Sequence, residues 1–224
     1  YHWTHLELKR SFGISDRLLN PDTAKGIWEA CNAKLATPEF RCRGIMKQMD
    51  VVLVCTTDDP TDDLSLHGQI ADDETFDVQV LPGWRPDKAL AVENVATWNA
   101  WTDKLAAAAD VDIKDFASFL GALVKRHEVF HAHGCRLSDH GLDTAYAEDY
   151  TDEEIVAIFA KARSGKALDE SEALKFKSAM LYVFGVMDCE KDWTQQYHLG
   201  AMRNNNVRMM AQLGPDTGYD SIGD

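Results

Sequence analysis

The chain has 224 residues, of which 45% are hydrophobic, and 23 Lys and Arg against 37 Asp and Glu give a net charge of −14. This length and composition allow an ordinary globular core. An acidic chain is repelled by phosphate backbones and anionic lipid, so we expect neither nucleic acid nor a membrane surface as a partner. No apolar run reaches the roughly 18 residues of a membrane span, and Tyr1–Glu7 lack the basic start and apolar core of a signal peptide.

The cysteines indicate a reducing compartment. They are five in number, widely spaced and without a CxxC pair: Cys31, Cys42, Cys55, Cys135 and Cys189. An odd number of scattered cysteines is typical of reduced, mostly buried thiols, so we expect a cytoplasmic protein. The spacing excludes a zinc finger.

The first fifty residues predict only helices. Residues 1–12 form the first, and a third is expected over 38–49. Between them, Asn20 and Pro21 predict the N-cap and first position of a helix that runs to about residue 35, because Asn caps helices well and Pro fits their first turn.

From residue 51 onward, strands alternate with helices. We predict strands over 51–57, 77–81, 135–138 and 194–200, and helices after Asp63 and over 87–108, 112–132, 151–163 and 169–189. The apolar, β-branched run at 51–57 is typical of a strand covered on both faces. The tail from Gly214 to the end predicts a turn-rich loop with no further element.

This alternation predicts an α/β fold with a parallel sheet and right-handed crossovers. Four strands over this length would make half of a (β/α)8 barrel. We therefore predict one partial domain, with a helical segment at 1–50 and four βα units with helical insertions at 51–224. An open sheet is the alternative, but without GxGxxG or GxxxxGK[ST] its nucleotide-binding uses have no support.

Polar side chains follow each predicted strand. They are Thr56, Thr57, Asp58, Asp59 and His67 for the first, Trp84, Arg85 and Asp87 for the second, Asp139 and His140 for the third, and His198, Arg203 and Asn204–Asn206 for the fourth. Because the carboxyl ends of parallel strands meet at one side, these groups are expected to share a pocket.

Each of these groups also has a structural interpretation. Asp62 and Asp63 suit turn and N-cap chemistry, and Asn204–Asn206 suit a loop with left-handed backbone. Arg85 is either a packed surface arginine or, on a rigid Pro-Gly-Trp-Arg-Pro turn, a bidentate carboxylate ligand. His140 is either functional or a buried imidazole bonded to a backbone carbonyl.

Two histidine pairs have the spacing of metal ligands but are better explained as structural. His131 and His133 close a predicted helix, where histidines interact favourably with the helix dipole and with free carbonyls. His2 and His5 lie one helical turn apart, and we expect a structural or supporting role for them as well.

Six motifs, in this order, resemble those of the uronate isomerase (glucuronate isomerase) family. They are Tyr1-His-Trp-Thr-His-Leu-Glu-Leu8, Thr56-Thr-Asp-Asp-Pro-Thr-Asp-Asp-Leu64, Trp84-Arg-Pro-Asp-Lys88, Gly134-Cys-Arg-Leu-Ser-Asp-His-Gly141, Tyr197-His-Leu-Gly-Ala-Met-Arg-Asn-Asn-Asn206 and Gly214-Pro-Asp-Thr-Gly218. The resemblance implies part of a distorted (β/α)8 TIM-like barrel with large helical insertions, in the metal-dependent amidohydrolase superfamily. It also implies interconversion of D-glucuronate with D-fructuronate, and of D-galacturonate with D-tagaturonate, in bacterial hexuronate breakdown.

The resemblance implies roles for several residues. Asp139 and His140 would be catalytic at the reacting end of the hexuronate. Trp84 and Arg85 would bind substrate, with Arg85 on its carboxylate or hydroxyls. The remaining substrate-binding residues, at the mouth of the site, would be His198 and Arg203.

Family members are about twice this long, so the chain resembles a central fragment. The divalent metal, usually zinc, is held in the family by a His-x-His pair and an aspartate that have no counterpart in these 224 residues. We therefore expect no main metal ligand in this chain and no activity from it alone. Half a barrel exposes sheet edges, so we also expect a homo-oligomer.

Two other functions are compatible with the same sequence. A metal-dependent hydrolase on the same barrel would use the same strand-end histidines. A non-catalytic helical interaction protein would use the amphipathic helices, but it has no need of polar residues at four strand ends.

Overall fold

The structure is a computed structural model that describes residues 1–223. The chain forms two compact units, one of Tyr1–Val54 with Asp73–Gln79 and one of Cys55–Asp72 with the residues from Val80 onward. The boundary between them falls within strands β1 (Leu53–Cys55) and β2 (Gln79–Leu81).

The first unit is mainly helical, as the sequence predicts. Its elements are α1 (His2–Phe12), α2 (Ala24–Leu35), the 3-10 helix η1 (Pro38–Phe40) and α3 (Cys42–Gln48). Helix α1 ends at Gly13, whose φ of 65° is the left-handed conformation that glycine adopts most easily. Leu8, Ile14 and Ile27 form a small buried cluster.

Two helix boundaries in this unit differ from the prediction. Helix α2 begins at Ala24, because the Asn20 side chain accepts hydrogen bonds from the N–H groups of Asp22 and Thr23 at 2.9 and 3.1 Å and holds a turn there. The predicted 38–49 helix is divided at Arg41, whose backbone is extended.

The second unit contains parallel strand segments arranged in chain order. Strand β3 (Leu137–Leu142) pairs in parallel with β4 (Thr194–Leu199) over their full length. Just beyond β1 and β2, parallel bridges join Asp58 to Trp84 and Trp84 to Ser138. This mixed α/β arrangement confirms the predicted parallel pairing.

The strands differ from the prediction in length and cover. Strands β1 and β2 are shorter than predicted, and β3 continues to Leu142 instead of ending at Ser138. The expectation that the first strand is covered on both faces is wrong for this structure, in which Val52 is 79% exposed and Leu53 45% exposed.

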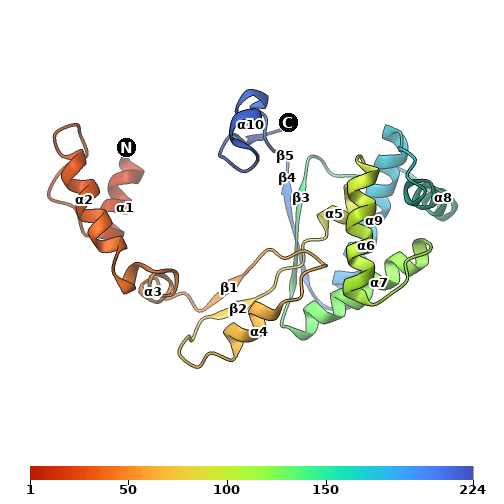
Figure 1. The fold of residues 1–224 in the computed structure, drawn as a ribbon, viewed down its shortest axis with the longest axis horizontal. Coiled ribbons are helices and arrows are strands. Elements are labelled where there is room, and N and C mark those ends of the chain that lie inside the picture. The colour runs from red at the N-terminus through yellow and green to blue at the C-terminus, as the bar shows by residue number, and fades with distance from the viewer. Residues whose placement is uncertain (224) are drawn as a thin grey trace. The chain divides into compact units, whose positions relative to one another are not determined.

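The helices between β2 and β4 lie on one side of β3 and β4 (Figure 1). They are α5 (Asp87–Leu90), α6 (Val95–Ala109), α7 (Phe116–Ala132), α8 (Asp152–Arg163) and α9 (Glu170–Glu190), and α4 (Ser65–Ala71) precedes β2. Buried aromatic rings of four helices meet in the core: Trp98, Phe119, Phe159 and Phe176. This large apolar core fixes one face of the strands.

The helix predicted at 87–108 is two helices. The chain leaves α5 after Leu90, and α6 starts anew at Val95 because the Asn94 side chain accepts a hydrogen bond from the Thr97 N–H at 3.0 Å. The C-terminal tail also differs from the prediction, since Ser221–Ile222 (β6) pairs in antiparallel fashion with Ala201–Met202 (β5) around helix α10 (Val207–Leu213).

None of the helices described over residues 1–223 is both long and apolar enough to cross a membrane. Within the same residues, all five cysteines are free thiols, but Cys135 alone is buried, so the expectation of mostly buried thiols is wrong.

Thr151 is predicted to stabilise the folded protein by capping the N-terminus of α8. Its hydroxyl accepts a hydrogen bond from the Glu154 N–H, and the Glu154 carboxylate accepts one from the Thr151 N–H at 2.8 Å. Thr151→Ala should lower the free energy of unfolding by about 1 kcal/mol in urea titration. Ser171→Ala, at an exposed position of α9, is the control and should stay within about 0.5 kcal/mol. Equal effects of the two substitutions would contradict the capping role.

Candidate active site

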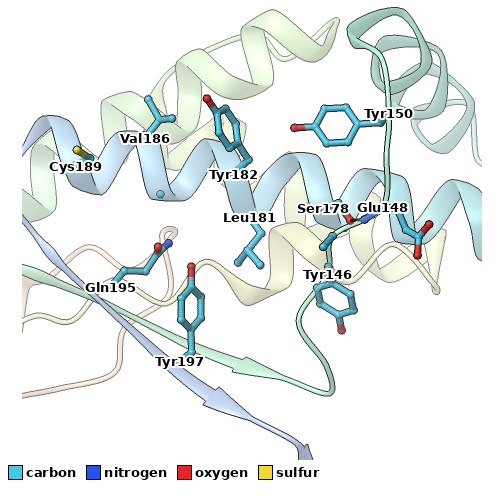
Figure 2. Close-up of a pocket in the computed structure, with 12 residues that line it drawn as sticks. Tyr146, Glu148, Tyr150, Ser178, Leu181, Tyr182, Val186, Cys189, Gln195 and Tyr197 are labelled. Atoms are coloured by element: carbon cyan, nitrogen blue, oxygen red, sulfur yellow. Dashed lines mark hydrogen bonds between the residues drawn. The ribbon is translucent and has the colours of Figure 1, made fainter.

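The register of β3 and β4 sorts their side chains onto two faces. Asp139 pairs with Gln196 and Gly141 with His198, while Ser138 and His140 pair with Gln195 and Tyr197. Since neighbouring side chains on a strand point to opposite faces, Asp139 and His140 lie on different sides of the sheet. Figure 2 shows Gln195 and Tyr197 pointing toward α9.

The face opposite α9 carries a polar group that we name the Asp139 cluster: Arg85, Asp139, Gln196 and His198. His198 Nε2 lies 2.7 Å from Asp139 Oδ1, and Arg85 Nη1 donates to Asp139 Oδ2 at 3.2 Å. Gln196 Nε2 is 3.2 Å from Asp139 Oδ1 and 3.1 Å from His198 Nε2. Asp139 is buried, whereas the His198 side chain is 52% exposed, so the cluster opens to solvent at His198.

Asp87 and Gly141 hold the Arg85 guanidinium in place. Arg85 Nε donates to Asp87 Oδ2 at 2.9 Å, and the same oxygen accepts from the Gly141 N–H at 2.9 Å. A Cβ added at Gly141 would lie 2.5 Å from Arg85 Nη2. The guanidinium can therefore lie against β3 only because residue 141 has no side chain.

The environment of Asp87 favours its ionised form. Burial, the largest influence, raises the pKa of the carboxyl, but the contacts with His140, the Gly141 N–H and Arg85 together outweigh it and hold the pKa below its ordinary value. Asp87 is therefore a carboxylate at neutral pH and can anchor the guanidinium.

His140 lies behind the cluster, with no exposed surface. Its Nδ1 is 3.3 Å from Asp87 Oδ1, and its Nε2 is 3.1 Å from Ser138 Oγ. The partner of its ring is thus a hydroxyl rather than the backbone carbonyl considered for a buried imidazole. A ring without exposed surface does not touch a bound molecule in this conformation, so the predicted catalytic role of His140 would have to act through Asp87.

Trp84 is also fully buried. Its ring packs edge-on against His127 and Phe130, and its Nε1 has no hydrogen-bond partner within residues 1–223. The backbone of Trp84 bridges to both Asp58 and Ser138. Its position supports a role in joining strands, and it gives the predicted contact with substrate no support.

Residues after β1 form a second polar group. Asp58 Oδ2 accepts from the Thr56 hydroxyl at 2.6 Å, and that hydroxyl is 2.7 Å from His67 Nε2. Asp59 accepts from Trp101 Nε1 at 2.9 Å and lies 3.0 Å from Lys88 Nζ. These side chains are engaged within the fold.

The structural interpretation of Asp62 and Asp63 is confirmed. Asp62 Oδ2 accepts from the Asp59 N–H, and Asp63 Oδ1 accepts from the Ser65 N–H at the start of α4, both at 2.9 Å.

The chain matches the glucuronate isomerase family model over residues 1–224. It belongs to that family. It is 56% identical over its whole length to the uronate isomerases of Cellvibrio japonicus and Bacteroides thetaiotaomicron, covering 48% and 47% of those chains. The chain thus spans about half the length of these curated relatives.

Solved structures of the family agree with this assignment. The crystal structure of uronate isomerase from Thermotoga maritima matches 100% of this chain and 49% of its own, with a TM-score of 0.89 and 36% sequence identity. The glucuronate isomerase from Caulobacter crescentus matches 99% of this chain and 46% of its own, with a TM-score of 0.87 and 27% identity.

Arg203 has a partner outside the Asp139 cluster. Its Nη1 lies 2.6 Å from Asp220 Oδ2, and Asp220 Oδ1 accepts from the Asn204 N–H. Asn204 has a φ of 55°, as expected for a loop with left-handed backbone, and Asn206 caps α10. Substrate binding by Arg203 stays a prediction.

Two residues that build the site or support the loop beside it are not among those expected from the sequence. Gln196 is one, and its signal was available, since it lies two residues before His198 on a strand and must share its face. Arg126, on α7, is the other. Its Nε and Nη2 donate to the carbonyls of Pro60 and Asp62 at 2.8 and 2.7 Å, which fixes the loop after β1, and nothing in the sequence indicates this contact.

The metal-ligating side chains of residues 1–223 do not gather into a site by themselves. Over the described stretch 1–223, no three His, Cys, Asp or Glu side chains lie close enough together to hold an ion. His131 Nδ1 accepts from Trp193 Nε1 at 3.0 Å, and His133 Nδ1 lies 2.8 Å from the Val129 carbonyl. His5 Nε2 accepts from the Leu19 N–H. These hydrogen bonds fit the structural interpretation of His131, His133 and His5, which stays a prediction.

A separate groove lies on the helix side of β4. It has a volume of about 550 Å³ and is lined by α9, β4 and the segment after β3, including Tyr146, Tyr150, Tyr182 and Tyr197 (Figure 2). The strand alternation that places Tyr197 here places His198 on the other face, so this groove is distinct from the Asp139 cluster.

Gly141→Ala is predicted to displace Arg85. The added methyl group would overlap the guanidinium, so in a crystal structure of the variant the contact of Arg85 with Asp139 should be lost. The unfolding midpoint should also fall. Gly121→Ala, on α7 with open space around it, is the control and should be neutral or stabilising because Ala favours helix. An unmoved Arg85 in Gly141→Ala would contradict the prediction.

Proposed function

We propose that this chain is the central part of a hexuronate isomerase. The reaction interconverts D-glucuronate with D-fructuronate, and D-galacturonate with D-tagaturonate, by moving a proton between C2 and C1. Family membership supports this, and so does one observation above all, the Asp139 carboxylate placed between Arg85 and the exposed His198. The five free thiols support a cytoplasmic location.

We also propose that the strands belong to a distorted (β/α)8 barrel. Support comes from the parallel bridges, which follow chain order from the end of β1 to β4, as in a barrel built of successive βα units. The likeness to two solved uronate isomerases supports the same conclusion. The Asp139 cluster then belongs to the interior face, because helices cover the other.

The Asp139–His198 pair suits the proton transfer. Aldose–ketose isomerisation needs a group near C1 and C2 that accepts a proton and returns it. Asp139 is fixed by Arg85 and Gln196, and it orients the His198 ring, which is half exposed to a bound sugar. In this proposal the pair handles the proton, with Asp139 holding His198 in place.

Arg85 suits the binding of the substrate carboxylate. A guanidinium has five N–H donors, and two of them bind Asp87 and Asp139. The remaining donors can hold an anionic group, and a fixed carboxylate positions the other end of the sugar for reaction.

The divalent metal that the family resemblance implies would polarise the sugar carbonyl oxygen. We propose that its main ligands lie outside this chain, as the family resemblance implies.

The first test is an isomerase assay with D-glucuronate and D-galacturonate, with and without zinc. The assay compares this chain with the full-length protein. That term means a protein of about twice this length, which we propose contains the chain. Activity is expected only in the full-length protein, because the metal ligands are outside the chain. Activity of the chain alone would contradict their placement, and an inactive full-length protein with bound zinc would contradict the isomerase proposal.

The second test is Arg85→Met in the full-length protein. Loss of the carboxylate clamp should raise KM for hexuronate at least tenfold while kcat changes less, because the clamp acts in both ground and transition states. Arg163→Met is the control, since Arg163 makes an ion pair with Asp103 and donates a hydrogen bond to the Asn99 side chain between α8 and α6. An unchanged KM would contradict the clamp, and a loss confined to kcat would place Arg85 at the reacting carbons instead.

A further inference from the structure

A buried carboxylate on α9, Asp188, has no part in the proposed reaction. It is 2% exposed, and its two oxygens have different partners. His127 Nε2 is 3.1 Å from Oδ1, and the Ser138 hydroxyl donates to Oδ2 at 2.6 Å. Burying a carboxylate beside a serine and a histidine is costly compared with apolar packing, so stability alone gives little reason for its presence.

The Asp188 contact fixes the direction of the next hydrogen bond. A serine hydroxyl has one proton, and a carboxylate only accepts, so the proton of Ser138 points to Asp188. Ser138 Oγ must then accept from His140 Nε2, 3.1 Å away. Asp188 thus determines that Nε2 of His140 carries a proton and directs it to Ser138.

The His140 ring transmits this orientation to Asp87. It lies against Phe184 and Tyr197, with ring centroids 5.8 and 5.5 Å away, and it has no exposed surface. Its Nδ1 faces Asp87 Oδ1 at 3.3 Å, and neither atom has a hydrogen bond to any other group within residues 1–223. The other Asp87 oxygen holds Arg85.

We propose that Asp188 and Ser138 are positioning residues of the active site, which act through His140 and Asp87 on Arg85. The inference rests on the proposed isomerase function and adds to it two residues on the helix side of the sheet. They touch no substrate. Their contacts fix the ring orientation and place of His140, so that Asp87 holds Arg85 beside Asp139.

The test compares two buried serines in the full-length protein. Ser138→Ala removes the link between Asp188 and His140, and kcat/KM for hexuronate should fall about tenfold. Ser178→Ala is the matched control, because Ser178 on α9 is also buried and hydrogen-bonded, to the Leu174 carbonyl and the Glu148 N–H. Its kcat/KM should stay within about twofold, although the two variants lose similar thermal stability.

A double-mutant cycle then tests the route through Asp87. If Ser138 acts only through His140 and Asp87, adding Ser138→Ala to Asp87→Asn should cost no further activity. If instead the two substitutions lower kcat/KM by independent factors that multiply in the double variant, the proposed route is wrong. Should Ser138→Ala not fold, Ser138→Cys fills the same space with a weaker donor and serves in both comparisons.

The outcomes separate this inference from the function on which it rests. If the wild-type full-length protein has no isomerase activity, the proposed function itself is wrong. An active wild type in which Ser138→Ala behaves like Ser178→Ala would leave the function in place and overturn the positioning role.

Discussion

The parallel pairing of β3 with β4 is the constraint on which the site depends. Six consecutive residue pairs fix the register. Alternation along the strands then gives one polar, partly open face and one face buried against helices. The adjacent residues Asp139 and His140 end up in different environments for this reason alone: Asp139 lies on the polar face beside the exposed His198, and His140 on the helix side without exposed surface.

Asp87, the first residue of α5, contacts groups on both faces of the β3–β4 pair. One of its oxygens faces the buried His140, and the other binds Arg85 and the Gly141 N–H. Buried charges are tolerated only when they are paired, and here each of three carboxylates has a histidine within 3.3 Å. The pairs are Asp139 with His198, Asp87 with His140, and Asp188 with His127.

Much of this arrangement follows from sequence pattern, and the exceptions have physical reasons. The alternation of elements predicts parallel pairing, and residues at strand ends do include Arg85, Asp139 and His198. The alternation of side chains along a strand also predicts that His140 and Asp139 lie on opposite faces, and that Gln196 lies on the same face as His198. Burial of Trp84 could not be predicted, because it depends on packing by α7, which is distant in sequence. The contacts of Asp188 depend in the same way on how α9 docks.

Two features of the secondary structure could not be predicted from sequence pattern either. They are the break between α5 and α6 and the strand pairing of the C-terminal tail. A side-chain cap at Asn94 overrides a continuous helical pattern, and two-residue strands are too short to leave a periodic signal. Local chemistry decides such features after the main periodicity is set.

The ladder register also limits how sequences of this family can change length. One residue inserted within β3 would exchange its two faces, placing imidazole where the carboxylate belongs and moving the polar face into the helical core. The segment between β3 and α8 carries no ladder pair, so insertions there leave the register intact. Length variation among relatives should therefore concentrate in such connections and be absent from the strands.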